Sequence, residues 1–283
     1  SGLIETAANG VPRIDFLGNT SGALKLEPQR TNLLPYSEDF NSGWIQYGSP
    51  TINISSIISP NGTLNGSKIT RGSNATPLRY ANVTTLNQEY TFSVYAKKGS
   101  VDIMILDIGD VAQVEFTLTD EWQRFEITQT PTTFTHIDIS FGTSTSGDNF
   151  YIWGAQLEQG SYPTSYIPTQ GSAVTRVADV CSQTPPSGII GQTEGVLFAD
   201  FVINGNSNPF TNIINTDRNT ISSISINLTK NTNKIAASVF ADVDTTINSF
   251  STYTNGQRLK VALLYKSGNI LLYINGVLEA SST

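Results

Sequence analysis

The chain has 283 residues, of which 38% are hydrophobic, 10% aromatic and only 14% charged. This length suffices for two domains that each bury a core, and the aromatic content argues against disorder. A formal net charge of −7 without a cluster of Lys and Arg disfavours nucleic-acid binding, and no run approaches the roughly 18 apolar residues that cross a bilayer.

The N-terminal part contains few strand signals. Residues 1–30 show only one brief alternation of apolar and polar side chains, at residues 11–16, so we expect an extended lead-in segment there. With so few charges, solubility depends on Ser, Thr, Asn and Gln, which fill most loops. Thr favours strands and Asn and Gly favour turns, so this composition indicates short strands joined by tight turns.

From residue 31 onward, runs with a period of two recur at the spacing of a β-sandwich. Gly, Pro, Asn or Asp stands in nearly every gap between them, and no stretch shows a capped apolar stripe with helical period. We therefore predict a first β-sandwich over residues 31–168. Its expected strands lie at residues 51–54, 90–96, 101–108, 114–118, 122–127, 134–141 and 150–153.

Residues 162–168, hereafter the strap, are predicted to be extended because each Pro there restricts its predecessor. A Pro- and Gly-rich linker over residues 169–191 follows, and then a second sandwich over residues 192–283. A hairpin signal at residues 273–278 is followed by only five residues, so we expect this domain to be truncated and the chain to belong to a longer polypeptide. The expected strands of the second sandwich lie at residues 195–201, 221–228, 235–240, 259–265 and 270–274.

Three motifs carry a resemblance to a known module. Residues 26–34 (LEPQRTNLL), 95–99 (YAKKG) and 153–160 (WGAQLEQG) with the strap resemble, in this order, a module of phage and prophage tail proteins. That module is similar to carbohydrate-binding jelly rolls of the galactose-binding type. Residues 194–201 and 271–277 are similar to laminin-G or concanavalin-A-like sandwiches. The expected fold is thus all-β, with a jelly roll followed by a concanavalin-A or laminin-G-like sandwich.

The resemblance implies a virion structural protein, part of a tail fibre or another surface appendage, that contacts host-surface glycan. Its partners would be that glycan, other virion proteins and further copies of the chain, in a homotrimer, at the virion surface. Two alternatives stay open: a purely architectural capsid or tail decoration, and an accessory carbohydrate-binding module of a secreted polysaccharide-degrading enzyme.

No catalytic pattern stands out, so we predict that the chain is not an enzyme. Glycoside hydrolysis usually needs two carboxylates across a cleft, and the Glu-x-Asp-x-x-Glu pattern of concanavalin-A-like glucanases is absent. Asp107 and Asp110 flank Gly109 in an expected turn and are interpreted as solvated turn acids. His136, the only histidine, lies on an alternating run that places it on the face of Asp138, and no Gly-x-Ser-x-Gly elbow accompanies it.

Metal and cofactor signals are equally sparse. Cys181 is the only cysteine, which excludes an intrachain disulfide and a cysteine-based zinc site. A calcium ion needs six to eight oxygen ligands, and no dense run of Asp and Asn supplies them. Related jelly rolls often carry a structural calcium ion, but the sequence assigns no ligands to one. We predict no cofactor and no metal ligands.

Sugar binding is the positive hypothesis. A sugar ring offers an apolar face to an aromatic side chain, and its hydroxyls bind Asn, Gln, Asp or Arg. For Trp153 the alternative is packing against the strap, and Trp122 and Phe125 are interpreted as core. The candidate sugar-binding residues are Trp44, Tyr47, Arg79, Tyr80 and Trp153.

Overall fold

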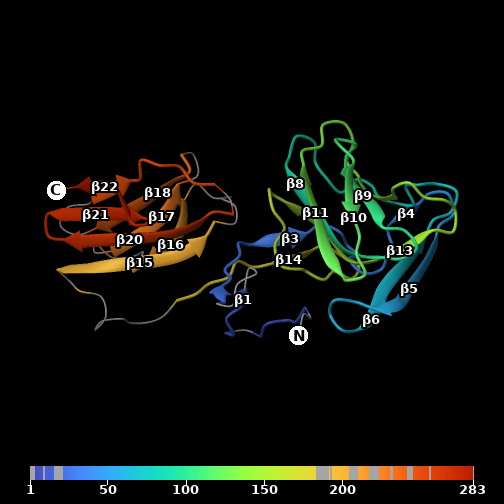
Figure 1. Cartoon of the computed structure of the whole chain (residues 1–283), viewed down its shortest axis with the longest axis horizontal. Helices are drawn as coiled ribbons and strands as arrows, with labels where there is room; N and C mark the ends of the chain where they lie inside the picture. The colour runs from blue at the N-terminus through green and yellow to red at the C-terminus, as the bar shows by residue number, and fades with distance from the viewer. Residues whose placement is uncertain are drawn as a thin grey trace. The chain divides into compact units, whose positions relative to one another are not determined.

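The computed structural model describes residues 4–8, 10–15, 22–182, 191, 193–203, 210–216, 223–229, 232–240, 245–254 and 256–282. All regular structure in these residues is β, which confirms the predicted class, and they contain no helix able to span a membrane. The chain divides into two compact units, Ser1–Cys181 and Ser182–Thr283, and most of their strands are labelled in Figure 1.

The first unit contains two five-stranded antiparallel sheets. The first sheet has the order β10-β9-β12-β7-β4 and the second sheet the order β11-β8-β13-β6-β5. Their bounds are β4 (Ile45–Gln46), β5 (Thr51–Ile58), β6 (Leu64–Thr70), β7 (Leu78–Tyr80), β8 (Tyr90–Lys98), β9 (Ile103–Ile108), β10 (Val114–Thr117), β11 (Gln123–Gln129), β12 (Ile137–Phe141) and β13 (Asn149–Gln159).

The connections of the first unit are those of a jelly roll. Successive strands from β6 to β9 alternate between the two sheets, and β10 to β13 retrace the path beside them. This gives the orders β6-β13-β8-β11 and β7-β12-β9-β10, the eight-stranded arrangement of two Greek keys, with β5 and β4 added at the edges. The strand order thus bears out the jelly roll.

The core of the first unit lies between its two sheets. Alternation turns every second side chain of a strand inward. Leu78, Met104 and Ile139 of the first sheet therefore pack with Phe92 and Phe150 of the second, and all five side chains are fully buried. Burying a side chain of this size stabilises the fold by about 1.5–3 kcal/mol. The predicted core residues Phe125 and Trp122 are only half-buried: Phe125 packs against the edge of this core, and Trp122 donates Nε1 to Ile58 O at 3.0 Å.

Two short antiparallel pairs complete the first unit. β1 (Ile14–Asp15) pairs with β2 (Ala23–Leu24) inside the expected extended lead-in, and β3 (Arg30–Asn32) pairs with β14 (Val174–Arg176). β14 lies inside the expected linker, so residues 169–181 belong to the first unit rather than to a free connection. Most of the remaining expected linker, including Pro185 and Pro186, lies outside the described residues.

The second unit also has two antiparallel sheets, of four strands each, with orders β15-β20-β21-β22 and β16-β17-β18-β19. Side chains such as Leu263, Leu272, Ile226 and Ile235 are 0% exposed and form its core. Its likeness to laminin-G or concanavalin-A-like sandwiches stays a prediction. The strands are β15 (Glu194–Val202), β16 (Phe210–Asn215), β17 (Ser223–Thr229), β18 (Lys234–Phe240), β19 (Thr245–Asn248), β20 (Arg258–Lys266), β21 (Asn269–Ile274) and β22 (Val277–Ser282).

Candidate functional site

The strap covers the outer face of the second sheet. Asn32 donates to Ile167 O at 2.9 Å, and Gln156 accepts a hydrogen bond from the backbone N–H of Ile167 at 2.7 Å. Glu158 accepts another from the N–H of Thr164 at 2.8 Å. These three side chains are fully buried. They belong to two of the motifs that carry the family resemblance, residues 26–34 and 153–160. Those motifs therefore fasten the strap and close this face.

Trp153 lies beneath the strap. Its ring is 1% exposed and packs against Tyr166 of the strap, with centroids 4.6 Å apart, and against Tyr95, at 5.4 Å. The backbone bulges here at Gly154, with a φ of +64°, where a Cβ would lie 3.2 Å from Tyr166. Burial and the neighbouring Glu38 carboxylate raise the pKa of Tyr166. Trp153 thus packs against the strap, which is the alternative to sugar binding given for it above. Its ring offers little surface to a sugar.

The outer face of the first sheet carries a row of side chains across four strands. Register pairs Ile45 with Arg79, Arg79 with Asp138, and Asp138 with Asp107. Because side chains alternate along a strand, these four point away from the core residues that flank them. The row therefore crosses the face of this sheet that is opposite the core.

Arg79 is the centre of this row. It donates from Nε and Nη2 to the two carboxylate oxygens of Asp138, at 2.7 and 2.6 Å, and this bidentate bond raises the pKa of Arg79 although partial burial opposes the rise. Its guanidinium also lies over the ring of Tyr47, 5.7 Å from the centroid. Tyr47 is 37% exposed and the neighbouring Ile45 42%, so exposed aromatic and aliphatic side chains adjoin a fixed cation.

Trp44 and Tyr80 support this surface from the core side. Trp44 is only 5% exposed, and its ring packs 5.4 Å from both Phe40 and Tyr80. Tyr80 is half-buried and lies so close to Gly43 that a Cβ there would be 2.9 Å from its ring. Of the five predicted sugar-binding residues, the structure thus brings Tyr47 and Arg79 together on the surface.

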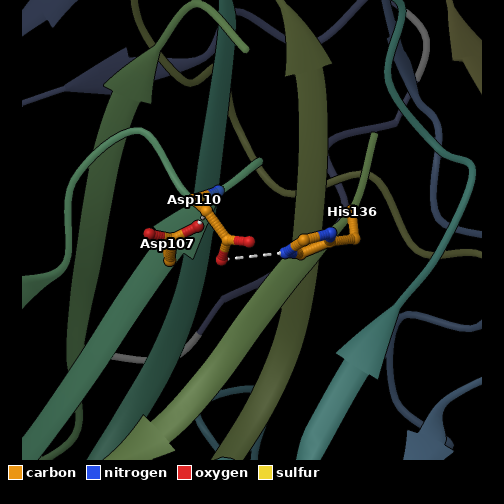
Figure 2. A group of neighbouring side chains, drawn as sticks. All are labelled: Asp107, Asp110 and His136. Atoms are coloured by element: carbon orange, nitrogen blue, oxygen red, sulfur yellow. Dashed lines mark hydrogen bonds and ion pairs between the residues drawn. The ribbon is translucent and has the colours of Figure 1, made fainter. Parts of the chain in front are cut away.

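Asp107, Asp110 and His136 gather at the far end of the row. Figure 2 shows the Asp110 carboxylate directed at the His136 ring, where Oδ1 lies 3.2 Å from Nε2. The Asp110 N–H donates to Asp107 Oδ1 at 2.7 Å. A Cβ at Gly109 would lie 2.5 Å from Phe134 O, so glycine permits the turn that folds Asp110 back over β9.

The interpretation of Asp107 as a solvated turn acid is wrong. Its side chain lies in β9 opposite Asp138 and is 3% exposed, because the turn and His136 cover it. Burial and the charges of Asp110 and Asp138 raise its pKa, while the Asp110 N–H and His136 oppose that rise. Asp110 does lie in the predicted turn, with a φ of +57° and a side chain that is 46% exposed. His136 shares a side with Asp138, as predicted, with Nε2 3.7 Å from Asp138 Oδ2.

Sequence reasoning missed Asp138 and Ile45 as members of the surface. Asp138 stands between Ile137 and Ile139, a pattern that places it opposite the core, but its partner Arg79 is distant in the chain. Only the pairing of β7 with β12 joins them. Strand alternation could have identified the face, although not the neighbours.

Comparison with known proteins gives only partial likenesses. No family model matches, and no curated protein matches. A structure of CBM22-1-GH10 modules of Clostridium thermocellum xylanase 10B, complexed with xylohexaose, is 13% identical over 49% of this chain, with a TM-score of 0.34, and this match spans only 30% of that chain.

Two smaller structures give similar values. One, titled "CBM4 structure and function", is 18% identical over 40% of this chain and 81% of its own, with a TM-score of 0.29. The other, titled "BiXyn10A CBM1 APO", is 15% identical over 45% of this chain and 99% of its own, with a TM-score of 0.31. Carbohydrate-binding modules are thus among the structural neighbours, but at TM-scores below 0.5 none of them assigns a function to this chain.

Proposed function

We propose that this chain is a non-catalytic glycan-binding protein, and that its first unit receives a sugar ring on the outer face of the first sheet. The observation that carries the proposal is the position of Arg79, held by Asp138 over the ring of Tyr47, on a face that the strap does not cover.

The chemistry of this surface suits a pyranose. Tyr47 and Ile45 present apolar surface to the C–H groups of a sugar ring. Arg79 donates to Asp138 from Nε and Nη2, and its Nη1 group has no hydrogen bond to the described residues. The Nη1 N–H groups can therefore donate to sugar hydroxyls. Because Asp138 fixes the guanidinium before the ligand arrives, little conformational entropy is lost on binding.

A second cation–aromatic pair in the same unit provides an internal comparison. Arg124 lies 5.6 Å over the ring of Tyr95, close to the 5.7 Å of Arg79 over Tyr47. Its Nη1, however, donates to Thr164 O of the strap at 2.7 Å, and its Nη2 donates to Ser93 Oγ at 2.9 Å. The strap therefore covers the Arg124–Tyr95 pair on the second sheet and leaves the Arg79–Tyr47 pair on the first sheet accessible. This difference favours the Arg79–Tyr47 pair as the binding surface.

The setting that we propose is a virion surface appendage, such as a tail fibre, in which a homotrimer presents three copies of this surface to host-cell glycan. The three ordered sequence motifs support the setting. Weak single sites gain avidity when copies are held on one rigid body, because the second and third contacts form at a high effective concentration. A surface poor in charge and rich in amides suits such an exposed position.

A glycan array probed with the full chain, tetramerised through a biotin tag, tests the proposal. We expect a defined glycan class to bind, and Tyr47→Ala to weaken binding of the single chain by about tenfold, near 1.4 kcal/mol. Tyr151→Ala is the matched control, since Tyr151 is a half-buried tyrosine of β13 on the other sheet.

Three outcomes would contradict the proposal. Absence of binding at millimolar sugar would favour a purely architectural role. Equal losses in both tyrosine variants would place the sugar elsewhere. A preference for plant polysaccharides over bacterial surface glycans would leave sugar binding intact and overturn the virion setting in favour of an accessory module.

A further inference from the structure

We propose that Asp107, Asp110 and His136 form a binding site for one divalent cation of the zinc class at the end of the β9–β10 turn. One carboxylate oxygen from each aspartate and one ring nitrogen of His136 all lie within 4.8 Å of one another. The three residues come from two regions of the chain, which the pairing of β9 with β12 brings together. The site is outside the Tyr47 surface, and its existence does not depend on sugar binding.

The burial of Asp107 is the independent observation that indicates a cation. Its side chain is 3% exposed, and its Oδ2 has no hydrogen-bond partner among the described residues. Buried polar atoms in proteins are nearly always hydrogen-bonded, and a buried carboxylate without a partner is costly. A metal ion bound by the Asp107 carboxylate would compensate its charge in this buried position.

The neighbouring charges do not fill this role. Asp138 is the cross-strand partner of Asp107, and like charges directly opposite each other are destabilising. The nearest guanidinium, that of Arg79, makes its short contacts with Asp138 and is 3.9 Å from Asp110 Oδ1. The end of the row thus holds three carboxylates against one arginine and one histidine, which leaves room for a further positive charge.

The ligand atoms are close to the spacing that zinc requires. With bonds of about 2.0–2.1 Å in a tetrahedral site, ligand atoms lie about 3.3 Å apart. Asp110 Oδ1 and His136 Nε2 are 3.2 Å apart without any adjustment. The ligand atoms lie within 4.8 Å of one another, so zinc binding requires the Asp107 carboxylate to approach by about 1.5 Å at most. Asp110 is 46% exposed, so water can reach the fourth position.

The donor set selects the class of ion. Calcium takes six to eight oxygen ligands, whereas this site offers two carboxylates and an imidazole nitrogen, a combination that suits zinc and similar transition metals. It therefore differs from the structural calcium ion that the family resemblance implies.

Zinc titration of the full chain, without a polyhistidine tag and with Cys181→Ser, tests the site. The exposed Cys181 would otherwise bind zinc itself. Since His136 is the only histidine, its ring NMR signals report on the site without ambiguity. We expect one equivalent of Zn²⁺ to shift these signals, and the same concentration of Ca²⁺ to leave them in place.

Two variants make the test specific. Asp110→Asn is expected to weaken zinc binding at least about tenfold, or 1.4 kcal/mol. It should fold normally, because Asn tolerates the positive φ of this position. Asp39→Asn is the control, because it also removes a carboxylate from a turn; Asp39 accepts a hydrogen bond from the Asn41 N–H. This variant should bind zinc with the affinity of the parent. Unmoved His136 signals at saturating zinc, or equal affinity in the Asp110 and Asp39 variants, would overturn the site; neither result bears on the glycan surface.

Discussion

Glu27 shows how a single side chain ties distant segments of the first unit together. It accepts hydrogen bonds from Arg13 Nη1 at 2.7 Å, from Arg176 Nη1 at 2.5 Å and from the N–H of Ser165 at 2.9 Å. The carboxylate is 8% exposed. Burial by itself raises its pKa, but the bond from Arg13 and the charges of Arg176 and Lys25 outweigh burial and lower the pKa to about 2.

Glu27 should therefore make the first unit sensitive to acid. Its pKa is about 2 in the folded chain and 4.5 as an ordinary glutamate, so its contribution to stability is complete above pH 4.5 and is lost as the pH falls toward 2. We expect Glu27→Gln to lower the free energy of unfolding by about 2 kcal/mol at pH 7, and the difference from the parent to vanish near pH 2. Urea unfolding across this range measures it.

Glu115→Gln provides the matched control, because Glu115 is exposed on β10. It should follow the parent protein at every pH. A Glu27 variant that is as stable as the parent at pH 7, or a difference that grows with acid, would contradict the role assigned to this carboxylate.

The sequence indicates residue chemistry better than residue neighbours. Tyr47 and Arg79 are identified from their types and lie together on the open face. Trp44 and Trp153 are chosen for the same reason, yet they lie in the interior, because large aromatic rings serve packing as well as recognition. Asp107 is misread since its burial depends on a strand pairing that no local pattern reveals.

At the scale of the elements, alternation finds the long central strands and misses the irregular ones. β8, β9 and β11 agree with their predicted ranges to within a few residues. β6 is missed because Asn65, Gly66 and Ser67 have turn-forming composition, and the strand exists through its pairing with β5 and β13. β3 and β14 are only three residues long each, and their pairing joins the two ends of the first unit.

The strap is the element whose attachment can be tested most directly. Gln156 accepts from the Ile167 N–H at 2.7 Å and donates to Glu158 at 2.7 Å, and it is 0% exposed. Gln156→Ala removes the acceptor of the buried Ile167 N–H, at about 1–3 kcal/mol, and one of the hydrogen bonds to the Glu158 carboxylate, at about 1.5–3 kcal/mol. We expect a loss of about 3 kcal/mol in urea unfolding and faster hydrogen exchange at the Ile167 amide.

Gln123→Ala, at an exposed position of β11, is the control and should change neither quantity. If the Ile167 amide of the Gln156 variant stays as protected as in the parent, the strap is held by other contacts.

At the scale of the whole molecule, the chain consists of two units with separate cores. We expect calorimetry to resolve two unfolding transitions. Leu263→Ala, in the second core, should destabilise one of them by about 3 kcal/mol and leave the other in place. Leu106→Ala, in the first core, should have the reverse effect. A single transition that both substitutions move equally would contradict two independent cores.

The central claim is that the open face of the first sheet, and not the face beneath the strap, meets the sugar. The most direct test is NMR of the arginine Nε–H groups while the full chain is titrated with a glycan that binds on the array. The Arg79 signal should shift as the glycan saturates the protein. The signal of Arg124, which forms the equivalent pair with Tyr95 under the strap, should stay fixed. A shift at Arg124 with Arg79 unmoved would contradict the account.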